Sequence, residues 1–169
     1  MAGMALVQES WTWNVAARET RPTRVVSGRR ILVVEDDVEM GCLLGAVLRA
    51  DGHDVVVARN GAEGVDHLLE SWEGDDAAQE RCDAAESERG PSREKFDLIV
   101  SDFRMPGWTG LEILEMQVNA EPAVPTILIT AFGAADLHQE ARRLGAAAVL
   151  DKPFDLDRLR RLVRVILAA

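Results

Sequence analysis

The sequence predicts an α/β protein with a parallel, doubly wound sheet, and three features of the 169-residue chain support this class. Short, mainly apolar runs alternate with segments in which apolar residues recur at helical spacing. Strands without polar alternation are typical of parallel sheets, which have helices on both faces. Turn-forming residues separate the segments, and five strands that alternate with five helices imply right-handed crossovers.

Each expected element has a local signature. The expected strands are short apolar runs, at residues 31–34, 55–58, 96–101, 126–130 and 147–150. The expected helices carry apolar residues on one face, at residues 40–48, 61–72, 111–118, 136–144 and 156–166. Asn60 and Asp155 are suited to cap two of these helices at the N-terminus, and Gly52 and Gly145 to end two others.

Length and composition predict one ordinary globular domain, with 47% apolar and 28% charged residues. No apolar stretch approaches the roughly 18 residues of a membrane helix. The start of the chain lacks a secretory pattern, so the cytoplasm is the expected compartment. The net charge of −10 argues against direct binding of nucleic acid, which needs a basic face. Cys42 and Cys82 are too isolated for a metal knuckle or a disulfide framework, and Cys42 is predicted to be a small core residue.

Two segments stand outside the alternating pattern. Residues 1–29 precede the first strand and are predicted to form a flexible N-terminal extension, although Trp11 and Trp13 could dock on the domain or on a partner. Residues 73–94 are polar, acidic and rich in alanine, and we expect a surface insertion that is partly helical or disordered. The folded domain is therefore expected at residues 30–169.

Side chains with chemical potential lie where the expected strands end. Glu35 and Asp36 follow the first strand, Asp102 closes the third, Thr130 ends the fourth and Lys152 follows the fifth. In doubly wound sheets, ligands bind beyond the carboxyl ends of the strands. We therefore expect these five side chains to meet at one edge of the sheet.

This set of residues suits a phosphoryl group and a hard divalent cation. Carboxylates that lie close together resist ionisation unless a cation compensates, and Mg²⁺ prefers oxygen ligands. Asp102 can attack phosphorus to form an acyl phosphate, Lys152 can balance the charge, and Thr130 can hydrogen-bond a phosphate oxygen. Each residue alone has an ordinary alternative role, as a cap or a solvated side chain. Their joint position at four strand ends favours a phosphoryl site.

The arrangement resembles the receiver domain of two-component response regulators over residues 30–167. The resemblance implies a flavodoxin-like sheet with strand order 2-1-3-4-5. It also implies that Asp102 is the phosphoacceptor, which takes its phosphoryl group from a histidine kinase with Mg²⁺ as cofactor. Glu35 and Asp36 match the acidic pair of the family, Asp36 being the more direct metal ligand.

The same resemblance implies roles for the remaining residues and exposes one departure. Arg104 would offer its backbone carbonyl to the metal, Thr130 matches the switch hydroxyl, and Lys152 matches the lysine that binds phosphate. The bond from Lys152 to Pro153 is cis in the family. The family often has an aromatic residue three positions before the lysine, where this chain has Val149, and the chain contains no tyrosine.

The leading functional hypothesis is a stand-alone receiver that is not an enzyme and signals by protein–protein contact. Only Ala168 and Ala169 follow the last expected helix, which leaves no room for an output domain. The expected partners are a histidine kinase or phosphotransfer protein and an unidentified downstream protein, without nucleic acid or membrane. Receivers can also pair as homodimers through their last helix.

Three alternatives remain open at this stage. The chain could be the regulatory fragment of a longer response-regulator transcription factor. It could be an aspartate-nucleophile phosphatase, but such enzymes usually have a second aspartate two residues after the nucleophile, where this chain has Arg104. It could also be a degenerate receiver that only binds partners; Val149 supports this reading, and the complete set of site residues opposes it.

Overall fold

The computed structural model describes residues 28–79, 95–117, 120, 123–131 and 135–169. The expectation of a flexible extension at 1–29 falls almost entirely outside these residues. The same is true of residues 80–94, the larger part of the expected insertion.

In the described part of the chain, five parallel strands form one sheet in the order β2-β1-β3-β4-β5. The predicted fold class and strand order are therefore confirmed. The strands are β1 Arg30–Val34, β2 Asp54–Ala58, β3 Leu98–Asp102, β4 Thr126–Thr130 and β5 Ala148–Asp151.

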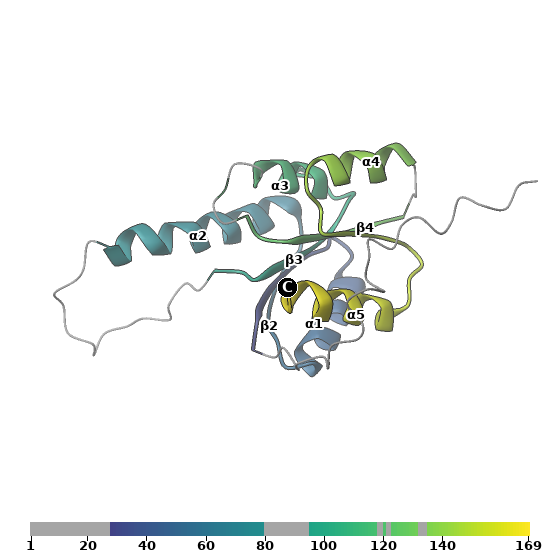
Figure 1. Cartoon of the computed structure of the whole chain (residues 1–169), viewed down its shortest axis with the longest axis horizontal. Helices are drawn as coiled ribbons and strands as arrows, with labels where there is room; N and C mark the ends of the chain where they lie inside the picture. Colours follow the sequence, from purple (N-terminus) through teal and green to yellow (C-terminus); the bar gives the residue numbers. More distant parts are fainter. Residues whose placement is uncertain (1–27, 80–94, 118–119, 121–122, 132–134) are drawn as a thin grey trace, which may run out of the picture.

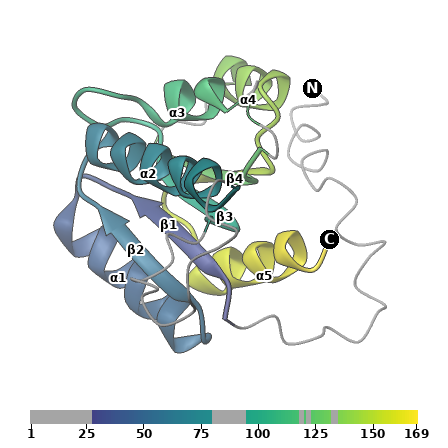
Figure 2. The ribbon, with the colours of Figure 1, turned by 90° about the vertical axis from the view of Figure 1, so that its left-hand side faces the viewer.

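Helices cover both faces of the sheet, as Figures 1 and 2 show. Over the described ranges they are α1 Val38–Ala50, α2 Gly61–Gln79, α3 Gly110–Met116, α4 Ala135–Arg143 and α5 Leu156–Leu167. The helices α1 and α5 lie on one face, and α2, α3 and α4 on the other (Figures 1 and 2). None of the helices in the described residues has both the length and the apolar character of a membrane span.

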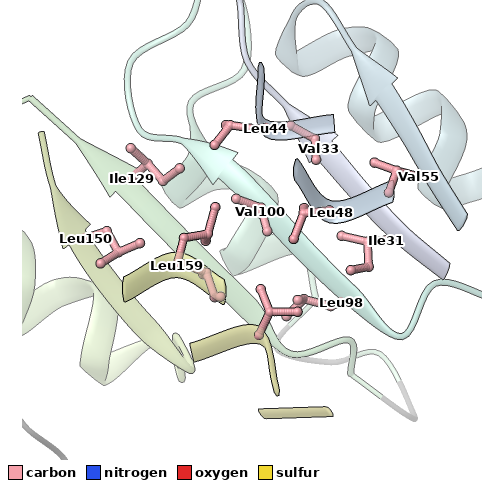
Figure 3. Packing of buried hydrophobic residues seen from close by; sticks show 12 residues of the cluster. Ile31, Val33, Leu44, Leu48, Val55, Leu98, Val100, Ile129, Leu150 and Leu159 are labelled. Carbon is pink, nitrogen blue, oxygen red and sulfur yellow. The ribbon is translucent and has the colours of Figure 1, made fainter. Parts of the chain in front are cut away.

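The central strands are apolar at successive positions because each face packs against helices. Ile31 and Val33 of β1 join the cluster beneath α1 and α5, which Figure 3 shows from close by. Leu32 and Val34 of the same strand point to the opposite face and join the cluster beneath α2 and α3. Successive strand residues face opposite sides, so a strand buried on both sides has no polar alternation.

Short polar side chains fix several helix starts. Asp37 caps α1 by accepting a hydrogen bond from the Met40 amide at 3.0 Å. Asn60 accepts one from the Glu63 amide at 2.9 Å, and Asp155 is the N-cap of α5. The predicted capping roles of Asn60 and Asp155 are thus confirmed.

The helix expected to end near Trp72 continues to Gln79, so the first residues of the expected insertion are helical, in agreement with the prediction that this segment is partly helical. The expected environment of Cys42, in contrast, differs from the structure. The prediction that Cys42 is a core residue is wrong, because this side chain is exposed. The buried stripe of α1 follows Gly41, Leu44, Gly45 and Leu48, at the i, i+3, i+4 and i+7 positions, and Cys42 lies one position off that stripe.

Candidate functional site

The sheet register brings the expected site residues to one edge. Strand β1 ends just before Glu35, and its last residue pairs with Ser101, the neighbour of Asp102. Asp102 in turn pairs with the penultimate residue of β4, and Thr130 pairs with Asp151 of β5. Parallel strands in this register end together, so the side chains that follow them share the same rim.

Three carboxylates converge at this rim. One oxygen from each of Glu35, Asp36 and Asp102 lies within 4.8 Å of the others. Glu35 is 2% exposed and Asp102 is 6% exposed, whereas Asp36 is open to solvent. The predicted convergence of the acids is therefore present in the structure.

Lys152 completes the cluster from the end of β5. Its Nζ lies 2.7 Å from Oδ1 of Asp102 and 3.0 Å from Oε2 of Glu35. Its backbone amide donates to the carbonyl oxygen of Thr130 at 2.6 Å, which fixes the lysine beside the end of β4. The peptide bond between Lys152 and Pro153 is cis, as the resemblance implied.

The electrostatics of the cluster follow from its burial. Burial raises the pKa of the Glu35 carboxyl; the hydrogen bond from Lys152 offsets part of this rise, and the charge of Asp102 adds to it. Burial alone would lower the pKa of Lys152, but its hydrogen bonds and ion pairs with Asp102 and Glu35 outweigh burial, so the pKa is raised. The ammonium group therefore stays charged and compensates one of the three carboxylates.

A backbone contact orients the Asp102 carboxylate. Its Oδ2 accepts a hydrogen bond from the Arg104 amide at 2.9 Å, while Oδ1 faces Lys152. The resemblance to the family implied a role for the carbonyl of Arg104. The hydrogen bond from its amide was not predicted, because no side-chain pattern signals a backbone donor. Thr130 is buried at the end of β4, beside Asp151 in the register.

The cluster suits a hard divalent cation. Glu35 and Asp102 pair with the Lys152 ammonium, and the carboxylate of Asp36 lies close to both acids, so three carboxylates cluster where Lys152 supplies one positive charge. Two of these acids are buried. All the candidate ligand atoms of the acids are oxygens, and one acid is open to solvent. This donor set fits Mg²⁺, which prefers oxygen and retains several waters.

Two further contacts near the rim were not predicted from the sequence. Val149, in the position where the family often has an aromatic residue, is half-buried and packs against the small cluster of Leu114, Leu128 and Ala141. His138 of α4 lies 2.8 Å from Asp151, the residue before Lys152.

A parallel five-stranded sheet with an acidic cluster and a lysine at its carboxyl edge is the arrangement that the sequence predicted for a receiver domain. The family model of the response regulator receiver domain matches residues 31–164. The chain therefore belongs to the response regulator receiver family of two-component systems.

Individual relatives agree with this assignment. Sporulation initiation phosphotransferase F of Bacillus subtilis is 29% identical over 80% of this chain and 90% of its own length. Transcriptional regulatory protein ZraR of Klebsiella oxytoca is 32% identical over 76% of this chain, which spans only 24% of that protein. The non-phosphorylated HemR receiver domain of Leptospira biflexa aligns with a TM-score of 0.63 and 28% identity, covering 83% of this chain and 95% of that domain.

Proposed function

We propose that this protein is a phosphoacceptor receiver, modified on Asp102 by a histidine kinase or a phosphotransfer protein. One observation carries the proposal: Asp102 is buried at the sheet edge, with one carboxylate oxygen facing Lys152 and the other held by the Arg104 amide. In this arrangement the two carboxylate oxygens have different hydrogen-bond partners, and the orientation of the carboxylate is set before a phosphodonor binds. Much of the acceleration of phosphoryl transfer comes from such positioning.

The transfer step is a substitution at phosphorus. An oxygen of the Asp102 carboxylate forms the new O–P bond while the N–P bond of the donor phosphohistidine breaks. The bonding pair of electrons returns to the imidazole, which then takes up a proton. The Nζ of Lys152 lies 2.7 Å from Oδ1 of Asp102 and can pair with the phosphoryl oxygens as the group is transferred.

Mg²⁺ would be held by Glu35, Asp36 and Asp102, with the backbone carbonyl of Arg104 as a further ligand. When bound, the ion supplies positive charge that offsets the charge of the phosphoryl oxygens. The residues of the chain supply the rest: Lys152 compensates the buried acids, and the Arg104 amide orients the acceptor.

The modified state would be sensed at the neighbouring strand ends. Thr130 ends β4 beside Asp151, so its hydroxyl is a candidate to hydrogen-bond the new phosphoryl group. Phosphorylation adds charge and strong acceptors, which can repack the face built by α4, β5 and α5. Val149 cannot act as an aromatic switch residue, so the response must use other contacts on this face.

We propose a stand-alone relay component that acts through protein–protein contact rather than by catalytic turnover. The relation to sporulation initiation phosphotransferase F, of which the chain spans 90%, supports this reading. A second reading is the regulatory domain of a longer transcription regulator. It is supported by relatives such as ZraR, of which the chain spans 24%; the reading frame around the coding sequence decides between the two.

The phosphoacceptor is tested by incubating the full chain with acetyl phosphate and Mg²⁺, followed by intact mass measurement. The wild type should gain one phosphoryl group, and both Asp102→Asn and removal of Mg²⁺ with a chelator should abolish the gain. Asp66→Asn removes an exposed carboxylate of α2 and is the matched control. A wild type without phosphate, or an Asp102→Asn variant that gains as much, would refute the assignment.

A further inference from the structure

The helix α4 has few apolar contacts with the rest of the protein. Among its residues with described side chains, only His138 and Ala141 are buried. The apolar cluster that Ala141 joins is small, with Leu114 and Leu128 as its other buried members. A helix with so little buried apolar surface depends strongly on any specific polar contact that holds it.

One such contact joins α4 to the end of β5. The Nε2 atom of His138 lies 2.8 Å from Oδ1 of Asp151. His138 is 8% exposed, while the Asp151 side chain is 49% exposed. A carboxylate only accepts, so the histidine must donate through Nε2. A buried donor that loses its acceptor costs free energy, which favours keeping α4 in this place.

The acceptor of this hydrogen bond is adjacent to the phosphoryl site. Asp151 pairs with Thr130 in the sheet, and the next residue is Lys152. The lysine amide donates to the Thr130 carbonyl, and the lysine side chain reaches Asp102. Any shift of Lys152 towards a phosphoryl group therefore acts on the residue that holds His138.

We propose that the His138–Asp151 hydrogen bond holds α4 against β5 and couples the phosphorylation state of Asp102 to the position of that helix, an inference that rests on the proposed function. In the unmodified protein, the bond keeps α4 against the strand. On modification, Lys152 turns towards the phosphoryl oxygens, the end of β5 adjusts, and α4 responds through His138. His138 and Asp151 are thus positioning residues that do not touch the reacting atoms.

The stabilisation of α4 by this hydrogen bond is tested first without phosphate, by hydrogen exchange of the full chain. Asp151→Ala and His138→Leu should speed amide exchange in α4 about fivefold, the effect of losing one hydrogen bond of ordinary net strength. Exchange in α1 and α5 should not change. His138→Gln retains an N–H donor and should keep wild-type exchange in α4, and Asp66→Ala is the control for loss of a carboxylate. Unchanged α4 exchange in Asp151→Ala would overturn the proposal.

The coupling of phosphorylation to α4 is tested with acetyl phosphate and Mg²⁺, at equal phosphate occupancy checked by intact mass. Phosphorylation should change α4 exchange in the wild type and in His138→Gln, but not in Asp151→Ala. An equal α4 response in phosphorylated Asp151→Ala, or a wild type whose α4 does not respond, would defeat the inference and leave the proposed function intact. A wild type that gains no phosphate would defeat both the proposed function and the coupling of phosphorylation to α4. The exchange measured without phosphate would still decide whether the hydrogen bond stabilises α4.

Discussion

Replacing Lys152 with methionine probes the electrostatic balance of the site most directly. Methionine keeps an unbranched side chain but removes the charge that faces Asp102 at 2.7 Å and Glu35 at 3.0 Å. Both carboxylates are buried, so the substitution leaves two negative charges close together without their ammonium partner. We expect the metal-free protein to be substantially less stable.

The magnitude follows from opposing terms. At these distances each pair attracts by about 6 kcal/mol with an effective dielectric constant of ~20. Removal of the ammonium from water opposes this attraction, and breaking one buried ion pair costs about 3–5 kcal/mol in practice. The Lys152 side chain is 24% exposed, so water screens the remaining charges and the lower value applies. A loss of about 3 kcal/mol lowers the melting temperature by roughly 6–12 °C for a chain of this size.

The assay is thermal unfolding followed by circular dichroism, in a chelator and in excess Mg²⁺. A cation bound by the native state at about 100 times its dissociation constant adds about 2.7 kcal/mol of stability. We expect Mg²⁺ to raise the melting temperature of Lys152→Met more than that of the wild type, because the bound ion replaces the missing positive charge.

The matched control is Lys95→Met, which removes the other lysine of the chain from an exposed position. This variant should unfold close to the wild-type temperature in both solutions. Equal melting temperatures of Lys152→Met and wild type in chelator would contradict the electrostatic reasoning. A Mg²⁺ response in Lys152→Met no larger than in the wild type would contradict the idea that the ion and the ammonium compensate the same acids.

Three further outcomes are expected. Gly110→Ala should destabilise the protein by about 1–3 kcal/mol in urea unfolding, because a Cβ there would clash with the backbone oxygen of Asp102; wild-type stability would contradict this. Burial lowers the pKa of His53 below its ordinary 6.5. The contribution of the neutral His53 to the free energy of unfolding should therefore be fully present above pH 6.5 and decrease as the pH drops below that value. The non-titrating variant His53→Gln should lack this slope, and an unchanged slope would assign it to other groups. The hydrogen bond from Arg160 holds the pKa of Asp51 below its ordinary 3.8. The stability that the ionised Asp51 contributes should be fully present above pH 3.8 and be lost as the pH falls through the lowered pKa. Acid unfolding curves would show this loss in the wild type and not in Asp51→Asn.

Much of the fold could be predicted because its signals are local. The apolar run at residues 31–34 is short and has no polar alternation, a pattern typical of a parallel strand covered on both faces. The caps at Asn60 and Asp155 were likewise visible, since a short polar side chain before an apolar helical pattern has a direct hydrogen-bonding role. The strand order came instead from the resemblance to a family, because local patterns do not say which strands are neighbours.

The wrong prediction for Cys42 arose because packing decides between similar local patterns. Cys42 shares its helix with the buried stripe of α1 but lies one position off it, and a periodicity argument without an exact helix phase cannot separate the two. The α2 helix continues to Gln79 through a polar, alanine-containing stretch. This agrees with the expectation of a partly helical segment. The helix end was expected near Trp72 because the apolar spacing stops there, whereas alanine and glutamate are good helix formers without apolar partners.

By itself, the sequence determined which elements form and that acids, a hydroxyl and a lysine follow the strands, because periodicity and turn chemistry are properties of neighbouring residues. The position of these residues at strand ends also predicted that they meet at one edge, but only the tertiary structure decided that the Lys152 ammonium pairs with Glu35, 117 positions away, and with Asp102 at the same time. The tertiary structure also decided that the Arg104 amide donates a hydrogen bond to Asp102 and that His138 is hydrogen-bonded to Asp151. Such contacts depend on register and on the packing of helices against the sheet, and these are set by the whole chain at once.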